Sequence, residues 1–137
     1  MKLNPYLNFG NKTEQAFLFY KSVFGSEFSM IQKFKEAPGD FPDSDKEKIM
    51  HVALPVGNST LMGSDTPESM MNNYKMGTNV SLSLEPDSKE QATELFNKLS
   101  AGGMVTMPLA DQFWGAWFGM CVDKFGIHWM VNYTYKK

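Results

Sequence analysis

The sequence predicts an α+β protein in which one unit, a strand followed by a helix and three more strands, occurs twice. The tripeptide Glu-Gln-Ala at 14–16 recurs at 90–92, and apolar residues then follow at the i, i+3, i+4, i+7 spacing of an amphipathic helix. Segments of alternating apolar and polar residues, typical of half-buried strands, flank each helix. We expect a single domain over 1–137, with module one at about 1–65, a linker at 66–78 and module two at about 79–137.

The first copy begins with a strand at 4–9, in which polar and apolar residues alternate. Asn11 and Glu14 have the spacing of a helix cap and the third helical residue, and Gly25 is placed to end that helix. Pro, Gly and Asp in 35–47 predict a surface loop. Three further strands are expected at about 27–34, 48–56 and 59–65.

The second copy repeats this order, starting with a strand at 79–85. Asp87 and Glu90 repeat the cap spacing, and Gly102-Gly103 follows the helix. Its further strands are expected at about 104–109, 116–122 and 127–134. In the linker, Met70-Met71 fits either a flexible lid over a cavity or packing under a long loop, and the sequence leaves both alternatives open.

The charge and composition exclude several classes of partner. The formal net charge of −2, with 20% charged residues, gives no basic surface for nucleic acid and no polybasic patch for a membrane surface. No apolar run reaches the ~20 residues of a membrane span, and the N-terminus lacks the charged-then-apolar layout of a signal peptide. We therefore expect a cytoplasmic protein that binds neither nucleic acid nor membranes.

Cys121 is the single cysteine, so the chain has no internal disulfide and no cysteine pair for zinc or redox chemistry. A buried, inert thiol is the expectation, because free cysteines are among the most buried residues. The alternative is a nucleophile paired with His128 on the neighbouring strand. The sequence contains no phosphate-cradling Gly-rich loop, nucleophile elbow or zinc-peptidase helix motif.

Alternation and turn chemistry assign the side chains of the first copy to two faces of its sheet. Gly57-Asn58 is a two-residue turn that pairs Leu54 with Leu61 and places His51 opposite Ser64. Residues opposite one another share a face, so one face packs on the helix and the other is polar. The polar face should carry Asn4, Tyr6, Asn8, His51, Ala53, Met62 and Ser64.

The second hairpin contains the stretch FWGAWFGM, which is rich in aromatic residues and glycine. A four-residue turn from Asp123 to Gly126 pairs Val122 with Ile127, which in turn places Trp117 opposite Asn132. Alternation along 79–85 places Ser81, Ser83 and Glu85 on the face away from the helix. The hairpin register adds Trp117, Gly119, His128, Met130 and Asn132 to that face and assigns Phe118, Met120, Trp129 and Val131 to the helix-facing core. A bulge at either glycine of the stretch would invert the facing of its tryptophans, and the sequence leaves this alternative open.

A family resemblance is carried by the segments PYLNF, FYKSVFG, KIMHVAL, LMGSD, SLSLE, GGMVTMPL and FWGAWFGMCVDKFGIHWMVN. In order and spacing, and over essentially the whole chain, they resemble the PhnB-like branch of the vicinal-oxygen-chelate superfamily, which has the glyoxalase/bleomycin-resistance fold. The resemblance implies two paired βαβββ modules whose curved sheets form a cup with the helices outside, often in a homodimer. The superfamily contains lyases, isomerases, dioxygenases, thiol transferases and drug-sequestering proteins, so the fold alone does not name the activity.

Metal-using members of the superfamily hold one divalent ion with His, Gln or Glu on the first and last strands of both modules. The matching positions here are Asn4, Met62, Ser81 and Met130, and none of them is a good ligand for a first-row metal. This departure from the superfamily's pattern predicts no metal site and no cofactor, with a divalent metal held by His51, Glu85 and His128 as the alternative. A methyltransferase of this family would need a nucleotide-cofactor site, and no Gly-rich strand-to-helix turn supplies one.

The predicted function is the binding of a small molecule in an aromatic-lined cup without a metal ion. The expected ligand-contacting residues are Tyr6, Asn8, His51, Met62, Ser64, Ser83, Trp117, Met130 and Asn132. The alternative is a lyase, isomerase or transferase of glyoxalase type, metal-dependent or metal-free, in which His51 is the base or a ligand. The expected partners are a small-molecule ligand and a second copy of the chain in a homodimer.

Overall fold

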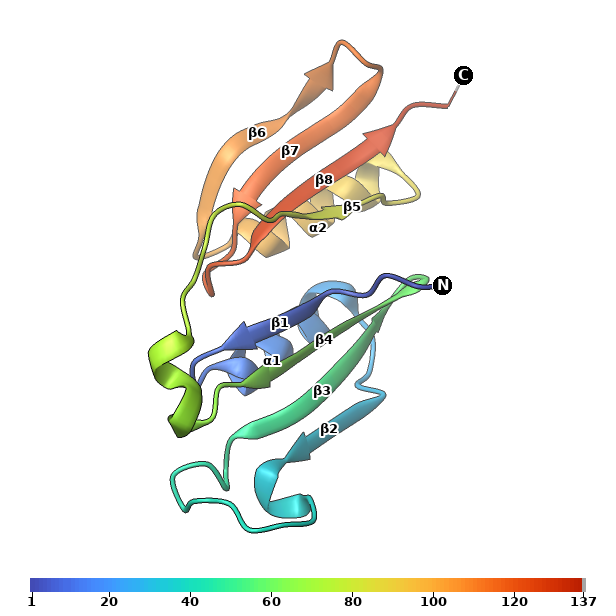
Figure 1. The fold of residues 1–137 in the computed structure, drawn as a ribbon. Coiled ribbons are helices and arrows are strands. Elements are labelled where there is room, and N and C mark those ends of the chain that lie inside the picture. The colour runs from blue at the N-terminus through green and yellow to red at the C-terminus, as the bar shows by residue number, and fades with distance from the viewer. Residues whose placement is uncertain (137) are drawn as a thin grey trace. The chain divides into compact units, whose positions relative to one another are not determined.

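The computed structural model describes residues 1–136, which form two compact units that divide between Lys75 and Met76 (Figure 1). We call them unit 1 and unit 2. Each unit contains a four-stranded mixed sheet and an α-helix, in the order strand, helix, three strands. The predicted α+β class and the repeated unit are therefore confirmed. Within residues 1–136, no helix is long and apolar enough to cross a bilayer.

Unit 1 consists of β1 (Tyr6–Phe9), α1 (Thr13–Phe24), β2 (Met30–Lys33), β3 (Ile49–Val56) and β4 (Ser59–Asp65), with two short 3-10 helices, η1 (Phe34–Glu36) and η2 (Glu68–Asn73). The sheet order is β1-β4-β3-β2, with β1 parallel to β4 and the other neighbours antiparallel. All four strands were predicted, although β1 and β2 are shorter than their predicted ranges. The helix η2 lies in the segment predicted as a linker.

Unit 2 consists of β5 (Leu82–Leu84), α2 (Lys89–Ser100), β6 (Met104–Gln112), β7 (Ala116–Val122) and β8 (His128–Thr134). Its sheet order, β5-β8-β7-β6, repeats that of unit 1, and β5 runs parallel to β8. The strand β5 is shorter than predicted, and β6 continues past the predicted end at 109.

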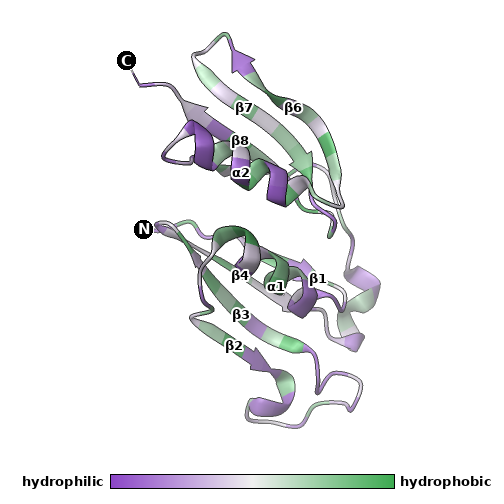
Figure 2. Ribbon diagram, turned by 180° about the vertical axis from the view of Figure 1, so that it is seen from behind, coloured by the Kyte–Doolittle hydropathy of each residue, from purple (hydrophilic) through white to green (hydrophobic). Residues whose placement is uncertain are grey.

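In both units the core lies between the helix and one face of the sheet. Helix α1 packs on β3 and β4, and α2 packs on β7 and β8. The core of unit 1 includes Leu7, Phe9, Phe17, Tyr20, Val52, Leu54 and Leu61, and that of unit 2 includes Ala92, Phe96, Leu99, Cys121, Trp129 and Val131. Hydrophobic residues along α1 are visible in Figure 2. The opposite side of each sheet, which we call the open face, carries no helix of its own unit.

Helix α1 is capped from a distance rather than by its own sequence. Its cap position is Lys12, whose side chain makes no capping hydrogen bond, so the predicted cap at Asn11 is wrong. The carboxylate of Asp65, at the end of β4, instead accepts a hydrogen bond from the Thr13 backbone N–H at 3.0 Å. At the other end, Gly25 adopts the left-handed conformation (φ 67°) and ends the helix as predicted.

Helix α2 has a local cap, one residue later than the sequence pattern indicated. The Ser88 hydroxyl accepts a hydrogen bond from the Gln91 backbone N–H at 3.0 Å, and the Gln91 side chain accepts one from the Asp87 backbone N–H at 2.7 Å. The cap and its partner are therefore Ser88 and Gln91, rather than Asp87 and Glu90. Both pairs have the same spacing, which alone does not choose between them.

The hairpin between β3 and β4 has the predicted register. Leu54 pairs with Leu61 and Ala53 with Met62, around a turn in which Gly57 has a positive φ of 56°. The turn therefore fixes which side chains of unit 1 share the open face, because a shift of one residue would have exchanged the faces.

The hairpin between β7 and β8 is one residue out of the predicted register. Val122 pairs with His128 rather than Ile127, and Trp117 with Tyr133 rather than Asn132. The turn is a three-residue loop, in which the Gly126 N–H donates to the Asp123 carbonyl and Gly126 has a φ of 93°. The buried Asp123 carboxylate accepts hydrogen bonds from the Phe125 and Ile127 backbone N–H groups, at 2.8 and 3.1 Å, which holds this shorter loop closed.

Candidate functional site

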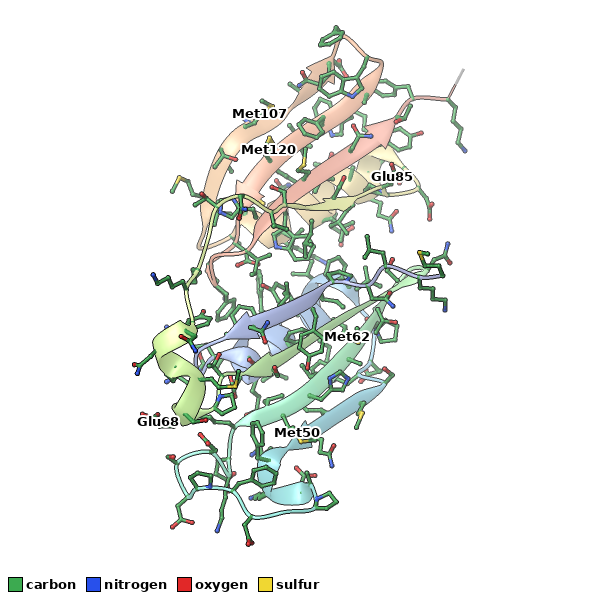
Figure 3. All side chains as sticks on the ribbon, viewed as in Figure 1. Met50, Met62, Glu68, Glu85, Met107 and Met120 are labelled. Atoms are coloured by element: carbon green, nitrogen blue, oxygen red, sulfur yellow. The ribbon has the colours of Figure 1, made fainter. Side chains whose placement is uncertain are left out.

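The open face of unit 1 gathers the predicted polar residues from three strands. Tyr6 on β1 lies beside Met62 on β4, and Asn8 lies beside Ser64. Met62 in turn pairs with Ala53 on β3, so the row continues across the sheet, and Figure 3 shows Met62 on this face. The neighbouring residues Leu7, Phe9, Val52, Leu54 and Leu61 are buried against α1. The predicted division of this sheet into two faces is therefore confirmed.

A hydrogen-bonded pair of aromatic residues lies at the centre of this face. The Tyr6 hydroxyl is 3.0 Å from Nδ1 of His51, and the two rings are stacked with centroids 5.6 Å apart. When the imidazole carries its proton on Nε2, Nδ1 accepts a hydrogen bond from the phenol. The pair thus joins an imidazole, which has two ring nitrogens, to a phenol that can donate or accept a hydrogen bond. Such a pair can bind a polar ligand atom or move a proton.

Two amides beside this pair have different roles. The Ser64 hydroxyl donates to Oδ1 of Asn8 at 3.3 Å, on the open face. By contrast, Oδ1 of Asn4 accepts a hydrogen bond from the Thr60 backbone N–H at 3.1 Å, which ties the N-terminal segment to β4. Asn4 therefore uses its oxygen within the fold, whereas Asn8 and Ser64 present polar atoms on the open face.

The open face of unit 2 is aromatic and sulfur-rich. The Trp114 indole N–H donates to Oδ1 of Asn132 at 3.3 Å, and the Trp114 ring packs edge-on against Phe118, with centroids 5.5 Å apart. Trp114 is 48% exposed and Phe118 only 7%, so the indole covers the phenyl ring and keeps a surface of its own. The next paired row contains Ser83, Met107, Met120 and Met130.

The predicted place of Trp117 on the same face as Asn132 is wrong. Its indole N–H donates to the Thr93 hydroxyl of α2 at 3.0 Å, and the Lys89 ammonium lies 4.3 Å from the centre of its ring. Trp117 and Gly119 thus face the helix, whereas Phe118 and Met120, predicted as core, are on the open face. The shorter turn at Asp123 causes the exchange, because a shift of one residue exchanges the two faces of a strand.

The faces of β8 are as predicted. Met130 and Asn132 lie on the open face with Ser83, and Trp129 and Val131 are buried against α2. Sequence reasoning missed Trp114, Phe118 and Met120 as open-face residues. The signal that could have found them is Gly126, since glycine at the last position of a three-residue hairpin loop favours the left-handed conformation seen here.

Cys121 lies opposite Trp129, so the predicted pairing with His128 is wrong. The thiol is only 1% exposed, and its burial, with a smaller contribution from the Asp123 carboxylate, raises the pKa of Cys121 to about 11. A thiol with such a pKa is almost entirely protonated at neutral pH and is a poor nucleophile. The structure supports the expectation of a buried, inert thiol.

The residues present do not fit the divalent metal site of the superfamily. Among residues 1–136, no three side chains of the types His, Cys, Asp or Glu are grouped closely enough to hold a metal ion. The side chains paired on the first and last strands are Tyr6 with Met62 and Ser83 with Met130. A phenol, a hydroxyl and two thioethers are a poor donor set for first-row divalent ions, which prefer imidazole and carboxylate.

Comparison with known proteins identifies the family. The family model described as 3-demethylubiquinone-9 3-methyltransferase matches residues 1–132. The chain is 30% identical to Protein YjdN of Escherichia coli strain K12, over 96% of this chain and 95% of that protein. It also resembles the crystal structure of protein PA1353 from Pseudomonas aeruginosa, with a TM-score of 0.87 and 39% identity over 99% of both chains.

Two further solved structures share the fold of this chain. A putative 3-demethylubiquinone-9 3-methyltransferase, PhnB protein, from Bacillus cereus has a TM-score of 0.78 and 26% identity, over 98% of this chain and all of that one. A glyoxalase/bleomycin resistance protein/dioxygenase family enzyme from Burkholderia phytofirmans, at 16% identity and a TM-score of 0.64 over 95% and 97% of the two chains, shares the fold. The chain therefore belongs to the family described as 3-demethylubiquinone-9 3-methyltransferase, the PhnB-like branch of the vicinal-oxygen-chelate superfamily with the glyoxalase/bleomycin-resistance fold.

Proposed function

We propose that this protein binds a small, planar or amphipathic organic molecule, without the divalent metal ion used elsewhere in its superfamily. The observation that carries the proposal is the arrangement of Trp114, Phe118 and Asn132 on the open face of unit 2. The half-exposed indole offers a flat apolar surface, and the Asn132 amide beside it offers polar atoms. An apolar surface with a few fixed polar groups is typical of sites for small organic ligands.

The description of the family as a methyltransferase does not fit the residues of this chain. Nucleotide-type cofactors commonly use the free backbone N–H groups at a helix N-terminus after a Gly-rich turn. In this chain Asp65 occupies the start of α1, and Ser88 with Gln91 occupies the start of α2. We therefore assign no methyl-transfer step to these residues.

Binding of 1-anilinonaphthalene-8-sulfonate, a planar amphipathic dye, tests the proposal directly. We expect saturable binding to the folded protein and clearly weaker binding to Trp114→Ala, since that variant loses the flat indole surface. Trp117→Phe is the matched control, because Trp117 lies on the helix-facing side and its replacement leaves the open face intact. Equal dye affinity in the wild type and Trp114→Ala, with the near-UV circular dichroism of both confirming native packing, would contradict the proposal.

A second candidate function is supported by the pair Tyr6 and His51 on unit 1. The hydrogen bond of 3.0 Å orients the imidazole. When the proton is on Nδ1 and is donated to the Tyr6 oxygen, Nε2 is free to accept a proton, which favours His51 as a general base in a glyoxalase-type isomerisation. In the isomerisation of an α-hydroxy ketone, His51 would take the proton from the hydroxyl-bearing carbon and return it to the former carbonyl carbon, while the hydroxyl proton passes to the former carbonyl oxygen. Tyr6 would act as a positioning residue that keeps the imidazole in place.

Hydroxyacetone in deuterated water is a suitable probe for this second function. If His51 is a base, the wild-type protein should speed the exchange of hydrogen for deuterium beside the carbonyl, as followed by NMR. His51→Gln should abolish the exchange, and Tyr6→Phe should lower it while shifting its pH profile. A wild-type protein that gives only the uncatalysed exchange rate would leave small-molecule binding as the better supported function.

We further propose that the protein is a cytoplasmic homodimer. The edge strand β6 exposes the apolar side chains of Met104 and Val105, at 62% and 45%, and a second copy would cover them. The lone, buried Cys121 is compatible with a reducing compartment. Light scattering after size-exclusion chromatography should give the mass of a dimer, and Val105→Lys should shift the protein toward the monomer.

A further inference from the structure

We propose that Met107, Met120 and Met130 form a site for a soft monovalent cation, Cu(I) or its analogue Ag(I), on the open face of unit 2. The three methionines come from the neighbouring strands β6, β7 and β8. Met107 pairs with Met120, and Met120 pairs with Met130, so they form one row across the sheet. Figure 3 shows Met107 and Met120 side by side on this face.

The register places the three methionines at neighbouring positions on three strands, with a shift of the β6–β7 register on either side of Met107. Residues directly opposite each other on neighbouring antiparallel strands have Cβ atoms about 4.5–5.5 Å apart. A methionine side chain has three rotatable bonds, so the sulfur atoms of such neighbours can converge without a change in the backbone. The adjacent residues Gly119 and Cys121 point toward α2, which leaves Met120 on the opposite side of the sheet.

The methionine row is accessible to ions from solution. Met107 is 40% exposed, and Met120 and Met130 are partly exposed rather than buried. Methionines that only fill space are usually found in a core, whereas these three lie on the side of the sheet without a helix. Packing against α2 therefore does not explain why three methionines are grouped on this face.

The donor chemistry selects the class of ion. Thioethers are soft, uncharged ligands that favour Cu(I) over the harder divalent ions. They also carry no titratable proton, so binding by sulfur alone should not depend on pH near neutrality. The Phe118 ring precedes Met120 by two residues on the same face, and an aromatic face attracts a bound cation further. Three thioethers, which are poor ligands for first-row divalent ions, thus fit a soft monovalent ion.

Unit 1 provides an internal contrast. Met62 occupies the place on the last strand that Met130 occupies in unit 2, but its neighbours are Tyr6 and Ala53. Met30 on β2 also pairs with Ala53, so the alanine separates the two methionines. Unit 1 therefore has no row of adjacent thioethers, and the proposal predicts binding by unit 2 alone.

Titration calorimetry with Ag(I) in chloride-free buffer, together with competition for Cu(I) against bicinchoninate, tests the site. We expect about one ion per chain, with an affinity that is unchanged between about pH 5.5 and 8. Met120→Leu should lower the affinity by about tenfold or more, because it removes the central sulfur while nearly conserving volume. Met107→Leu and Met130→Leu should each lower it as well.

Two control variants show whether Ag(I) binds to this row of methionines or to any methionine of the protein. Met104→Leu removes an exposed sulfur from the same strand, β6, but Met104 pairs with Val122 and lies outside the row. Met62→Leu removes the isolated thioether of unit 1. Both controls should bind Ag(I) like the wild type. Ag(I) should also raise the melting temperature of the wild type and of both controls, but hardly that of Met120→Leu.

Three results would overturn the site. The first is the absence of heat and of competition with the wild-type protein. The second is an equal loss of affinity in Met104→Leu and Met120→Leu. The third is loss of binding in His128→Gln with full binding in Met120→Leu, since His128 lies on the same face, opposite Val122. Dye binding by the Met120→Leu variant shows separately whether the organic-ligand surface at Trp114 is intact, so the two proposals fail independently.

Discussion

The two units repeat one topology but present different chemistry on their open faces. In unit 1 this face is polar and hydrogen-bonded, around Tyr6 and His51. In unit 2 it is aromatic and sulfur-rich, around Trp114 and Met120. The strand order and the side of the sheet covered by the helix are the same in both. The repeated backbone and its core are thus compatible with two distinct surfaces.

The helix-facing sides of the two units share two structural features, a glycine at the closest approach of the helix and a buried aspartate. In each unit a glycine on a strand allows the helix to approach closely, Gly63 beside Phe17 and Gly119 beside Phe96. In each unit a buried aspartate also satisfies backbone N–H groups that the sheet and helix leave unpaired. The helix-facing sides of the two units are therefore alike in packing and hydrogen bonding, whereas their open faces differ.

Removal of the buried aspartates should have the largest effect on stability. Asp65→Ala leaves the N–H groups of Thr13 and Ile49 without their acceptor, and Asp123→Ala does the same to Phe125 and the Trp129 indole. Each loss should cost about 3 kcal/mol of unfolding free energy, because buried donors lose a charged partner. Urea denaturation followed by circular dichroism measures it. A much smaller loss in one variant would show that the two aspartates are not equivalent.

The variants Gly63→Ala and Gly119→Ala compare how tightly helix and sheet pack in the two units. At Gly63 an added Cβ would lie 2.6 Å from the buried Phe17 ring and 2.9 Å from the Leu7 carbonyl oxygen. At Gly119 the nearest atoms are side-chain carbons of Phe96 and Leu109, at 2.9 and 3.1 Å. Overpacking should lower the free energy of unfolding by about 1–3 kcal/mol. Gly63→Ala should be at the upper end, because the Leu7 carbonyl group, unlike a side chain, cannot rotate away. The same urea series ranks the two variants, and the reverse order would contradict this account.

Alkaline pH should weaken unit 2 through Cys121. Because the folded-state pKa of this thiol is raised to about 11 from an ordinary value of 9.0, the unfolded chain loses the proton first as the pH rises. Stability from this group is complete below about pH 9 and decreases toward pH 11. Unfolding midpoints measured across this range should fall less steeply in Cys121→Ala than in the wild type. Parallel pH profiles would mean that the thiol is not the group responsible.

The smallest effect is expected at the surface of α2. The Lys98 ammonium pairs with the Glu94 carboxylate at 2.8 Å, four residues earlier on an exposed side of the helix. Lys98→Ala should lower stability by only about 0.3–0.5 kcal/mol, and salt should reduce that difference. Thermal melts at low and high salt measure it. In contrast to the aspartate variants, a loss above about 1 kcal/mol would indicate a further role for Lys98.

The two hairpins show how much of the site could be predicted from sequence. Gly57-Asn58 specifies a two-residue turn, and the faces of β3 and β4 followed correctly from it. At Asp123 the sequence permits turns of three or four residues, and hydrogen bonds to the Asp123 carboxylate decide between them. Local alternation could not reveal those bonds, and the faces of β7 were therefore assigned the wrong way round.

The two helices were predicted correctly from sequence, but the residues that cap them were not. The existence and phase of both helices followed from their apolar spacing. The cap of α2 was wrong by one residue, since two overlapping patterns have the same spacing there. The start of α1 depends on Asp65, which is far away in the sequence and reaches the helix only through the parallel pairing of β1 with β4. Contacts of this range have no local signature.

The parallel pairing of the first and last strands of each unit also bears on how the chain folds. Tyr6 meets Met62 in one unit, and Leu82 meets Trp129 in the other, so the ladder that completes each sheet joins opposite ends of the unit. Such long-range contacts slow folding, because a long loop must close before they form. During synthesis, β1 must therefore wait without its partner until β4 has left the ribosome, and β5 must wait in the same way for β8.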